Sequence, residues 1–159
     1  VLAARFLSHR EAEEESTGDV TEHWNVPHGT IDVWWRGMKN GALMLLMAHL
    51  LHRNPPWRAN PIRVLRVVEN EEAIDEVHKH LIELGASSRI QFQSEVICDK
   101  GSPGDIIRST SRDAALVLLG FQTPDEGEEL ELFRRMEEIA GDLPRVLMVD
   151  SAGGMELES

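Results

Sequence analysis

The stretch IDVWW, residues 31–35, is followed at residues 41–51 by GALMLLMAHLL. The first segment has β-branched and aromatic residues without a breaker, and it predicts a strand. The second is apolar round most of its circumference and predicts a covered helix that ends at Arg53, because Asn54-Pro55-Pro56 cannot continue it. Asn40 stands where a helix cap is expected. This strand-turn-helix unit decides the fold.

The alternation of predicted strands and helices continues to residue 149. Further strands are predicted at 62–69, 89–97, 114–120 and 144–149, and further helices at 71–86, 103–112 and 124–142. Asn70 is expected to cap the first of these helices and Gly85 to end it. Strands that alternate with helices indicate a parallel sheet with helices on both faces and right-handed crossovers.

Two strands differ in a way that predicts their places in the sheet. Residues 89–97 alternate between apolar and polar side chains, which is typical of an edge, whereas 114–120 is apolar throughout, which is typical of a strand covered on both faces. The expected fold is therefore α/β, a doubly wound, Rossmann-like, parallel five-stranded sheet of order 3-2-1-4-5. This topology is shared with universal stress proteins, and it puts residues 31–35 in the centre beside 114–120.

The chain divides into three parts. Residues 1–29 have no strong period and are expected to be a lead-in from a preceding subdomain, with 1–8 as the end of a helix. Residues 30–150 form the α/β domain, and 151–159 form a tail. The sequence starts without a basic leader or an initiator Met, so we expect it to be part of a longer polypeptide.

The composition restricts the partners. A formal net charge of -12 repels phosphate backbones and anionic lipid, so no nucleic acid partner is expected. The apolar run at 43–51 is far shorter than the roughly 20 residues of a bilayer span, so this segment is not expected to insert into a membrane. The single cysteine, Cys98, excludes a disulfide within the chain.

The sequence offers few candidates for chemistry. On such a sheet a ligand binds at the carboxyl ends of the strands, here the loops 36–40 and 120–127. Arg36 and Lys39 are weak candidates for an anion site. Gly120 is followed by Phe, Gln, Thr, Pro and Asp, so no glycine-rich loop can enclose a phosphate. We expect no cofactor, no metal and no catalytic residue. The protein is therefore not expected to be an enzyme.

The helix at 41–53 is more apolar than a surface helix needs to be. Its excess apolar side chains require a second cover, which either the lead-in segment or another copy of the chain could supply. We favour a subunit or domain interface. The candidate interface residues are Leu43, Met44, Leu46, Met47 and Leu50.

Several segments carry a family resemblance. GTIDVWW, NGALMLLMAHLL and a Trp at 57 before PIRVLRVVE resemble the carboxyl-terminal cytosolic domain of the cation-chloride cotransporters. DAALVLLGFQTP and LPRVLMVDSAGG are similar to the closing segments of that domain, in the same order. The resemblance covers residues 28–154. The segment CDKGSPGDIIRSTSRD is short where eukaryotic members carry a long charged insertion, which suggests a prokaryotic member.

The resemblance implies a function. The chain would be the second of two universal-stress-protein-like subdomains on the cytoplasmic face of the cell membrane, in an integral membrane protein that moves Na/K/Cl. It would be a non-catalytic regulatory module that forms a homodimer and contacts the transmembrane domain and first cytosolic subdomain of its own polypeptide. The alternative is a universal-stress-protein-like sensor that binds a nucleotide or another small anion at the loops 36–40 and 120–124.

Overall fold

A computed structural model describes residues 2–6 and 26–152 of the chain. The described residues form a six-stranded sheet in the order β1-β6-β5-β2-β3-β4. The strands are β1 (Leu2–Phe6), β2 (Ile31–Trp34), β3 (Ile62–Val68), β4 (Gln93–Cys98), β5 (Leu116–Gly120) and β6 (Arg145–Val149). The five from β2 to β6 are parallel to one another. Their order confirms the predicted arrangement 3-2-1-4-5, with residues 31–34 in the centre.

The sixth strand was not predicted. β1 pairs antiparallel with β6, so that Leu2 lies opposite Val149 and Phe6 opposite Arg145. The expected end of a helix at residues 1–8 is therefore wrong for residues 2–6. Leu, Ala and Arg have high helix propensity, but the unpaired edge of β6 offers backbone partners that outweigh this local preference. The remainder of the lead-in up to residue 25 lies outside the described residues.

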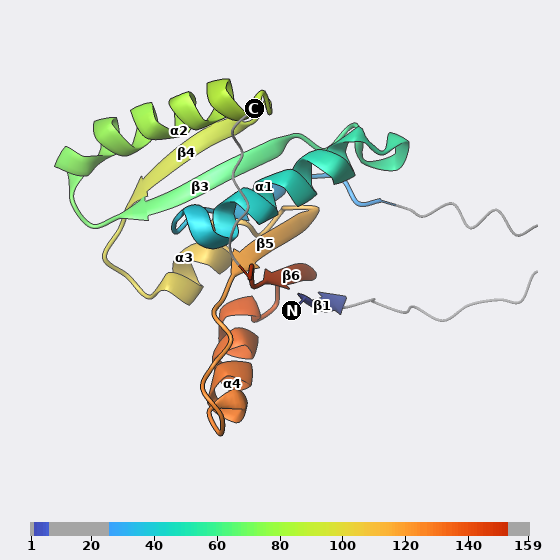
Figure 1. Cartoon of the computed structure of the whole chain (residues 1–159), viewed down its shortest axis with the longest axis vertical. Coiled ribbons are helices and arrows are strands. Elements are labelled where there is room, and N and C mark those ends of the chain that lie inside the picture. The colour runs from blue at the N-terminus through green and yellow to red at the C-terminus, as the bar shows by residue number, and fades with distance from the viewer. Residues whose placement is uncertain (1, 7–25, 153–159) are drawn as a thin grey trace, which may run out of the picture.

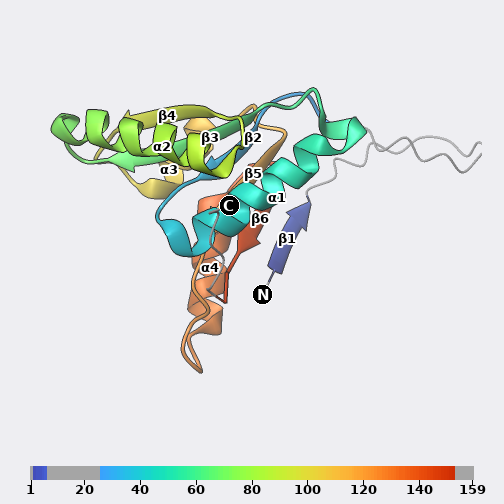
Figure 2. The same cartoon turned by 45° about the horizontal axis from the view of Figure 1, so that its top comes forward.

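Helices cover both faces of the sheet (Figures 1 and 2). The elements besides strands are α1 (Met38–Arg53), η1 (Pro55–Trp57), η2 (Glu71–Ala73), α2 (Ile74–Ser88), α3 (Pro103–Thr110) and α4 (Glu129–Ala140). One core contains residues of α1 and α2, such as Met44 and Leu81. The other contains residues of α3 and α4, such as Ile106 and Ala140. Both faces of the central strand are thus buried.

The two tryptophans of residues 31–35 pack into different cores. Trp34 packs into the α3/α4 core and Trp35 into the α1/α2 core, and each is at most 5% exposed. Gly41 of α1 lies directly over the Trp35 ring, where an added Cβ would come within 2.6 Å of ring carbon Cζ3. The glycine therefore lets α1 approach the tryptophan, which explains why the two segments occur together.

Several predicted helix boundaries are wrong, and α4 begins at Glu129 where residue 124 was expected. α1 begins at Met38, so Asn40 lies within its first turn and does not cap it. α2 continues past Gly85 to Ser88 and ends with Arg89 in the left-handed region at φ 55°. Gly85 has a packing role, because a Cβ there would lie only 3.3 Å from Phe92 Cε1.

Candidate functional site

The carboxyl ends of three strands are joined by the side chain of Asn40. Its Nδ2 donates a hydrogen bond of 2.6 Å to the carbonyl oxygen of Phe121, which follows β5. Its Oδ1 accepts one of 2.8 Å from the backbone N–H of Ser151, which follows β6. One amide from α1 thus ties together the loops that would form a ligand crevice in an open α/β sheet.

The same asparagine fills the space at the end of β5. A Cβ placed on Gly120 would lie 2.9 Å from Asn40 Cβ and 3.0 Å from Asn40 Nδ2. Gly120 is therefore needed for close packing of α1 against the strand. In phosphate-binding sites, by contrast, a glycine lets the backbone approach the ligand. Here an asparagine side chain occupies that position.

The neighbouring charges form an ion pair. Lys39 Nζ lies 3.6 Å from Asp150 Oδ1. Asp150 Oδ2 also accepts hydrogen bonds from the backbone N–H and the hydroxyl of Thr123. These bonds, the Thr123 hydroxyl foremost, together with Lys39 lower the pKa of Asp150 below its ordinary value although burial opposes them. The carboxylate stays ionised near neutral pH.

The two predicted anion ligands, Lys39 and Arg36, lie in different surroundings. Lys39 is half exposed and faces a carboxylate, which offsets much of its attraction for an anion. Arg36 is exposed on the loop after β2. An anion entering beside Lys39 would meet the negative charge of Asp150 at close range. The anion site stays a prediction, and the Lys39–Asp150 geometry offers it little support.

A second polar cluster lies within the α3/α4 face of the sheet. Asp32 on the central strand is fully buried and makes a two-pronged ion pair with Arg63 of β3, at 3.0 Å from Nε and 2.7 Å from Nη2. The carboxylate also accepts hydrogen bonds of 2.6 Å from Thr30 and Ser111. Ser111 in turn accepts from Trp34 Nε1 at 3.0 Å. All five side chains have hydrogen-bond partners inside the protein.

Arg63 joins this cluster to the edge of the sheet. Its guanidinium also donates to the backbone oxygen of Thr110 at 3.0 Å and to Glu95 of β4 at 3.1 Å. The hydrogen bond to Asp32 is the main cause that raises the pKa of Arg63, so the guanidinium stays charged at every accessible pH. Sequence reasoning missed this cluster. Its one signal is Asp32 in the otherwise apolar strand β2, opposite a strand, β3, in which Arg63 and Arg66 are the only charged residues.

The five candidate interface residues of α1 are not equivalent. Met44 is 1% exposed and packs in the α1/α2 core, so it cannot meet another chain. Leu43, Leu46 and Met47 are half-buried, and Leu50 is 60% exposed. Met38 at the start of the helix is 49% exposed and was not among the candidates. The helix thus has a buried stripe and a partly open one.

The family model described as Solute carrier family 12 matches residues 8–105, which is more than half of the chain. The chain belongs to the cation-chloride cotransporter family. No curated protein matches it. The matched span holds the tryptophan strand and α1, while the resembling segments at 113–124 and 143–154 lie outside it.

The family places this cotransporter domain among integral membrane transporters of cations and chloride. Across residues 2–6 and 26–152, no helix combines the length and the apolar character that a bilayer span requires. In the same residues, no three His, Cys, Asp or Glu side chains come together in a way that could hold a metal ion. His78 and His80 are exposed on α2, and His52 Nδ1 lies 2.9 Å from the backbone oxygen of Asn60. Cys98 is exposed and forms no disulfide.

Proposed function

We propose that this chain is a non-catalytic regulatory domain of a cation-chloride cotransporter, on the cytoplasmic side of the membrane. It acts by contact: it dimerises and biases the transmembrane part of the protein. The family assignment supports the transporter setting. The observation that carries the non-catalytic, ligand-free interpretation is the position of Asn40.

The closure of the crevice argues against a sensor of nucleotides. A nucleotide at the carboxyl ends of the strands would have to displace Asn40 from Phe121 and Ser151, both of which it holds at 2.8 Å or less. It would also have to separate Lys39 from Asp150, or else bind beside the carboxylate. These hydrogen bonds are part-buried, and each polar group that stays buried without a partner would cost about 1–3 kcal/mol, which opposes nucleotide binding at this edge.

The open stripe of α1 is the surface through which the domain would make contact. Leu50 exposes 60% of its surface, and Leu43, Leu46 and Met47 are only half-buried. Covering such side chains contributes about 25 cal/mol per Å² of apolar area removed from water. The occupant we propose is the remainder of the transporter polypeptide, which is the partner that a domain of a larger protein always has at hand.

Ion flux in the full transporter tests the proposal. Leu50→Glu places a charge on the open stripe of α1, and we expect lower flux at an unchanged amount of protein in the membrane. Leu130→Glu is the matched control, because Leu130 is 62% exposed on a different helix, α4. Equal flux for the wild type and both variants would contradict the proposal. Circular dichroism of the isolated variant chains checks that each is folded.

A further inference from the structure

A row of arginines follows the edge of the sheet at which the parallel strands begin. The segments that lead into β3, β4, β5 and β6 all lie at this edge, because these strands run in the same direction. We name the row the arginine edge; its members are Arg53, Arg58, Arg89, Arg112 and Arg145. The first four are exposed and the last is half-buried. Among residues 2–6 and 26–152, none of them takes part in a salt bridge.

Helix ends account for only part of this row. Arg53 is the last residue of α1 and Arg89 directly follows α2, and a positive charge stabilises the carboxyl end of a helix. Arg58 instead follows the short η1, and Arg145 is the first residue of β6. The stability of the long helices therefore does not explain why these two positions are charged.

The positive charge is least offset where the chain enters β3 and β4. Residues 53–61 and 89–92 contain arginines and no acidic residue, whereas the loops into β5 and β6 contain Asp113 and Asp142. β3 and β4 are neighbours in the sheet, and neighbouring strands are about 5 Å apart. Arg58 and Arg89 thus occupy adjacent places along the edge, where one ligand with several negative charges can contact both.

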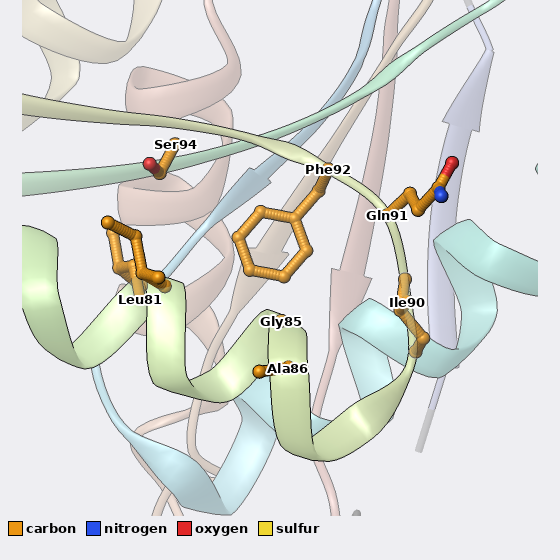
Figure 3. Close-up of a pocket in the computed structure, with 8 residues that line it drawn as sticks. Leu81, Gly85, Ala86, Ile90, Gln91, Phe92 and Ser94 are labelled. Atoms are coloured by element: carbon orange, nitrogen blue, oxygen red, sulfur yellow. The ribbon is translucent and has the colours of Figure 1, made fainter.

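An apolar groove adjoins Arg89 at this edge (Figure 3). It has a volume of about 320 Å³ and lies between α2 and the segment that leads into β4. Ile90 and Gln91, which directly follow Arg89 in the chain, line it together with Phe92. The helix side of the groove is low because Gly85 has no side chain. The surface therefore combines positive charge with room for an apolar side chain.

An acidic segment of the same chain is attached at both ends to this edge. Residues 11–22 contain six acidic residues and no basic one. The acidic residues are Glu11, Glu13, Glu14, Glu15, Asp19 and Glu22. The segment lies outside the described residues, but the chain before and after it is described. Before it, Phe6 lies opposite Arg145. After it, the backbone oxygens of Pro27 and Gly29 accept hydrogen bonds of 2.8 and 2.9 Å from Asn60 Nδ2, two residues beyond Arg58.

The length of the connection permits contact with Arg58. Glu22 is four residues from Val26, and an extended chain spans about 3.3–3.6 Å per residue, so Glu22 can reach about 13 Å from the point of entry. A ligand tethered by a short linker has an effective concentration in the millimolar range. A contact that would be weak between separate molecules is therefore populated within one chain.

We propose that residues 11–22 bind the arginine edge of their own chain and that salt releases them. Their carboxylates pair with Arg58 and Arg89, and the groove takes Val20, the one side chain of the segment that is apolar and larger than alanine. Exposed charges are screened by salt, since the Debye length falls from about 30 Å at 0.01 M to about 3 Å at 1 M. In a cation-chloride cotransporter, this contact makes the lead-in sensitive to the ionic strength around the domain. The inference goes beyond the contact function, because it concerns the chain alone.

Disulfide trapping in the 159-residue chain tests the contact. Ser16→Cys and Ala59→Cys, in a Cys98→Ser background, place one thiol in the acidic segment and one beside Arg58. We expect a disulfide within the chain on oxidation at about 0.01 M NaCl, formed about tenfold more slowly at 1 M. A rate that salt leaves unchanged would overturn the proposal. So would a disulfide between two copies in place of one within the chain.

Charge reversal at the two edges of the sheet separates a specific contact from random encounters of a tethered segment. Arg58→Glu together with Arg89→Glu should slow the disulfide at low salt by about tenfold. Arg36→Glu is the matched control, because Arg36 is exposed on the loop after β2, at the opposite edge. Equal effects of the two reversals, or no effect of either, would contradict the assignment to the arginine edge.

A synthetic peptide of residues 9–23 gives an independent readout. Replacing the four glutamates between residues 11 and 15 with Gln in the chain should expose the arginine edge, and this variant should bind the peptide at least about tenfold more tightly than the wild type. Val20→Ser in the peptide should weaken its binding. Equal affinity of both chains, or binding by neither, would overturn the proposal. Because neither measurement involves ion flux, each can fail while Leu50→Glu still lowers flux, and the converse also holds.

Discussion

Replacing Asp32 with Ala should be among the most damaging single changes in this domain. The carboxylate is fully buried, and it accepts four hydrogen bonds from Thr30, Arg63 and Ser111. Removing it leaves a guanidinium that is 20% exposed with only Glu95 and the Thr110 carbonyl as partners. It also leaves the buried Ser111 hydroxyl without its acceptor.

The magnitude follows from the loss of one partner of a buried pair, which costs about 3–5 kcal/mol. The partial exposure of Arg63 and its remaining bonds place the expected loss at the lower end, about 3 kcal/mol. Urea unfolding should show this as a fall of about 1–3 M in the midpoint, since the slope for a domain of this size is roughly 1–3 kcal/mol per M.

Glu95→Ala supplies the matched control, because it removes the other carboxylate from the same guanidinium. Glu95 is 45% exposed, so its loss should cost less than about 1 kcal/mol. The reasoning is refuted if the two variants lose the same free energy of unfolding, or if Asp32→Ala loses less than about 1 kcal/mol. Either result would mean that burial does not determine how much the Asp32–Arg63 ion pair contributes to the free energy of unfolding.

Three further changes test other parts of the structure. Gly41→Ala should lower the free energy of unfolding by about 1–3 kcal/mol, because the added Cβ would meet the buried Trp35 ring at 2.6 Å. Thermal or urea unfolding measures this change. A more stable variant would show that the higher helix propensity of alanine outweighs the clash. Asn40→Ala should speed hydrogen exchange at the Ser151 amide and cost about 1–3 kcal/mol, and unchanged exchange would contradict the bridging role. The lowered pKa of Asp150 means that its ionised form stabilises the fold above the unfolded pKa of 3.8, and that this contribution is lost as the pH falls through the folded value. Thr123→Val should therefore destabilise the domain at pH 6 but hardly at low pH, and a deficit that is the same at both would refute this assignment.

Much of the sheet could be predicted from hydrophobic pattern alone. The half-polar run at 89–97 and the wholly apolar run at 114–120 reveal how many faces of each strand are covered, and that information gives the strand order. β1 could not be predicted, because its pairing with β6 is a long-range contact and its own residues favour a helix. Local propensity and tertiary pairing disagree there, and pairing prevails.

The site was harder to predict for the same reason. Asn40 looked like a helix cap because its neighbours in sequence suggested one, yet its partners are Phe121 and Ser151, more than 80 residues away. Asp32 has no periodic signal in the sequence. Its structural role depends on Arg63 and Ser111, which only the fold brings into hydrogen-bond contact with it. The over-apolar helix predicts a second cover for its excess apolar side chains, and that cover stays a prediction. Only the fold separates Met44 in the core from Leu50 at the surface.

The most direct test of the central claim is a calorimetric titration of the chain with ATP. The closed edge at Asn40 and the Lys39–Asp150 pair predict no saturable heat at nucleotide concentrations up to about 1 mM. A saturable isotherm with a micromolar dissociation constant, abolished by Lys39→Ala, would contradict the account and establish a nucleotide sensor in place of a contact domain.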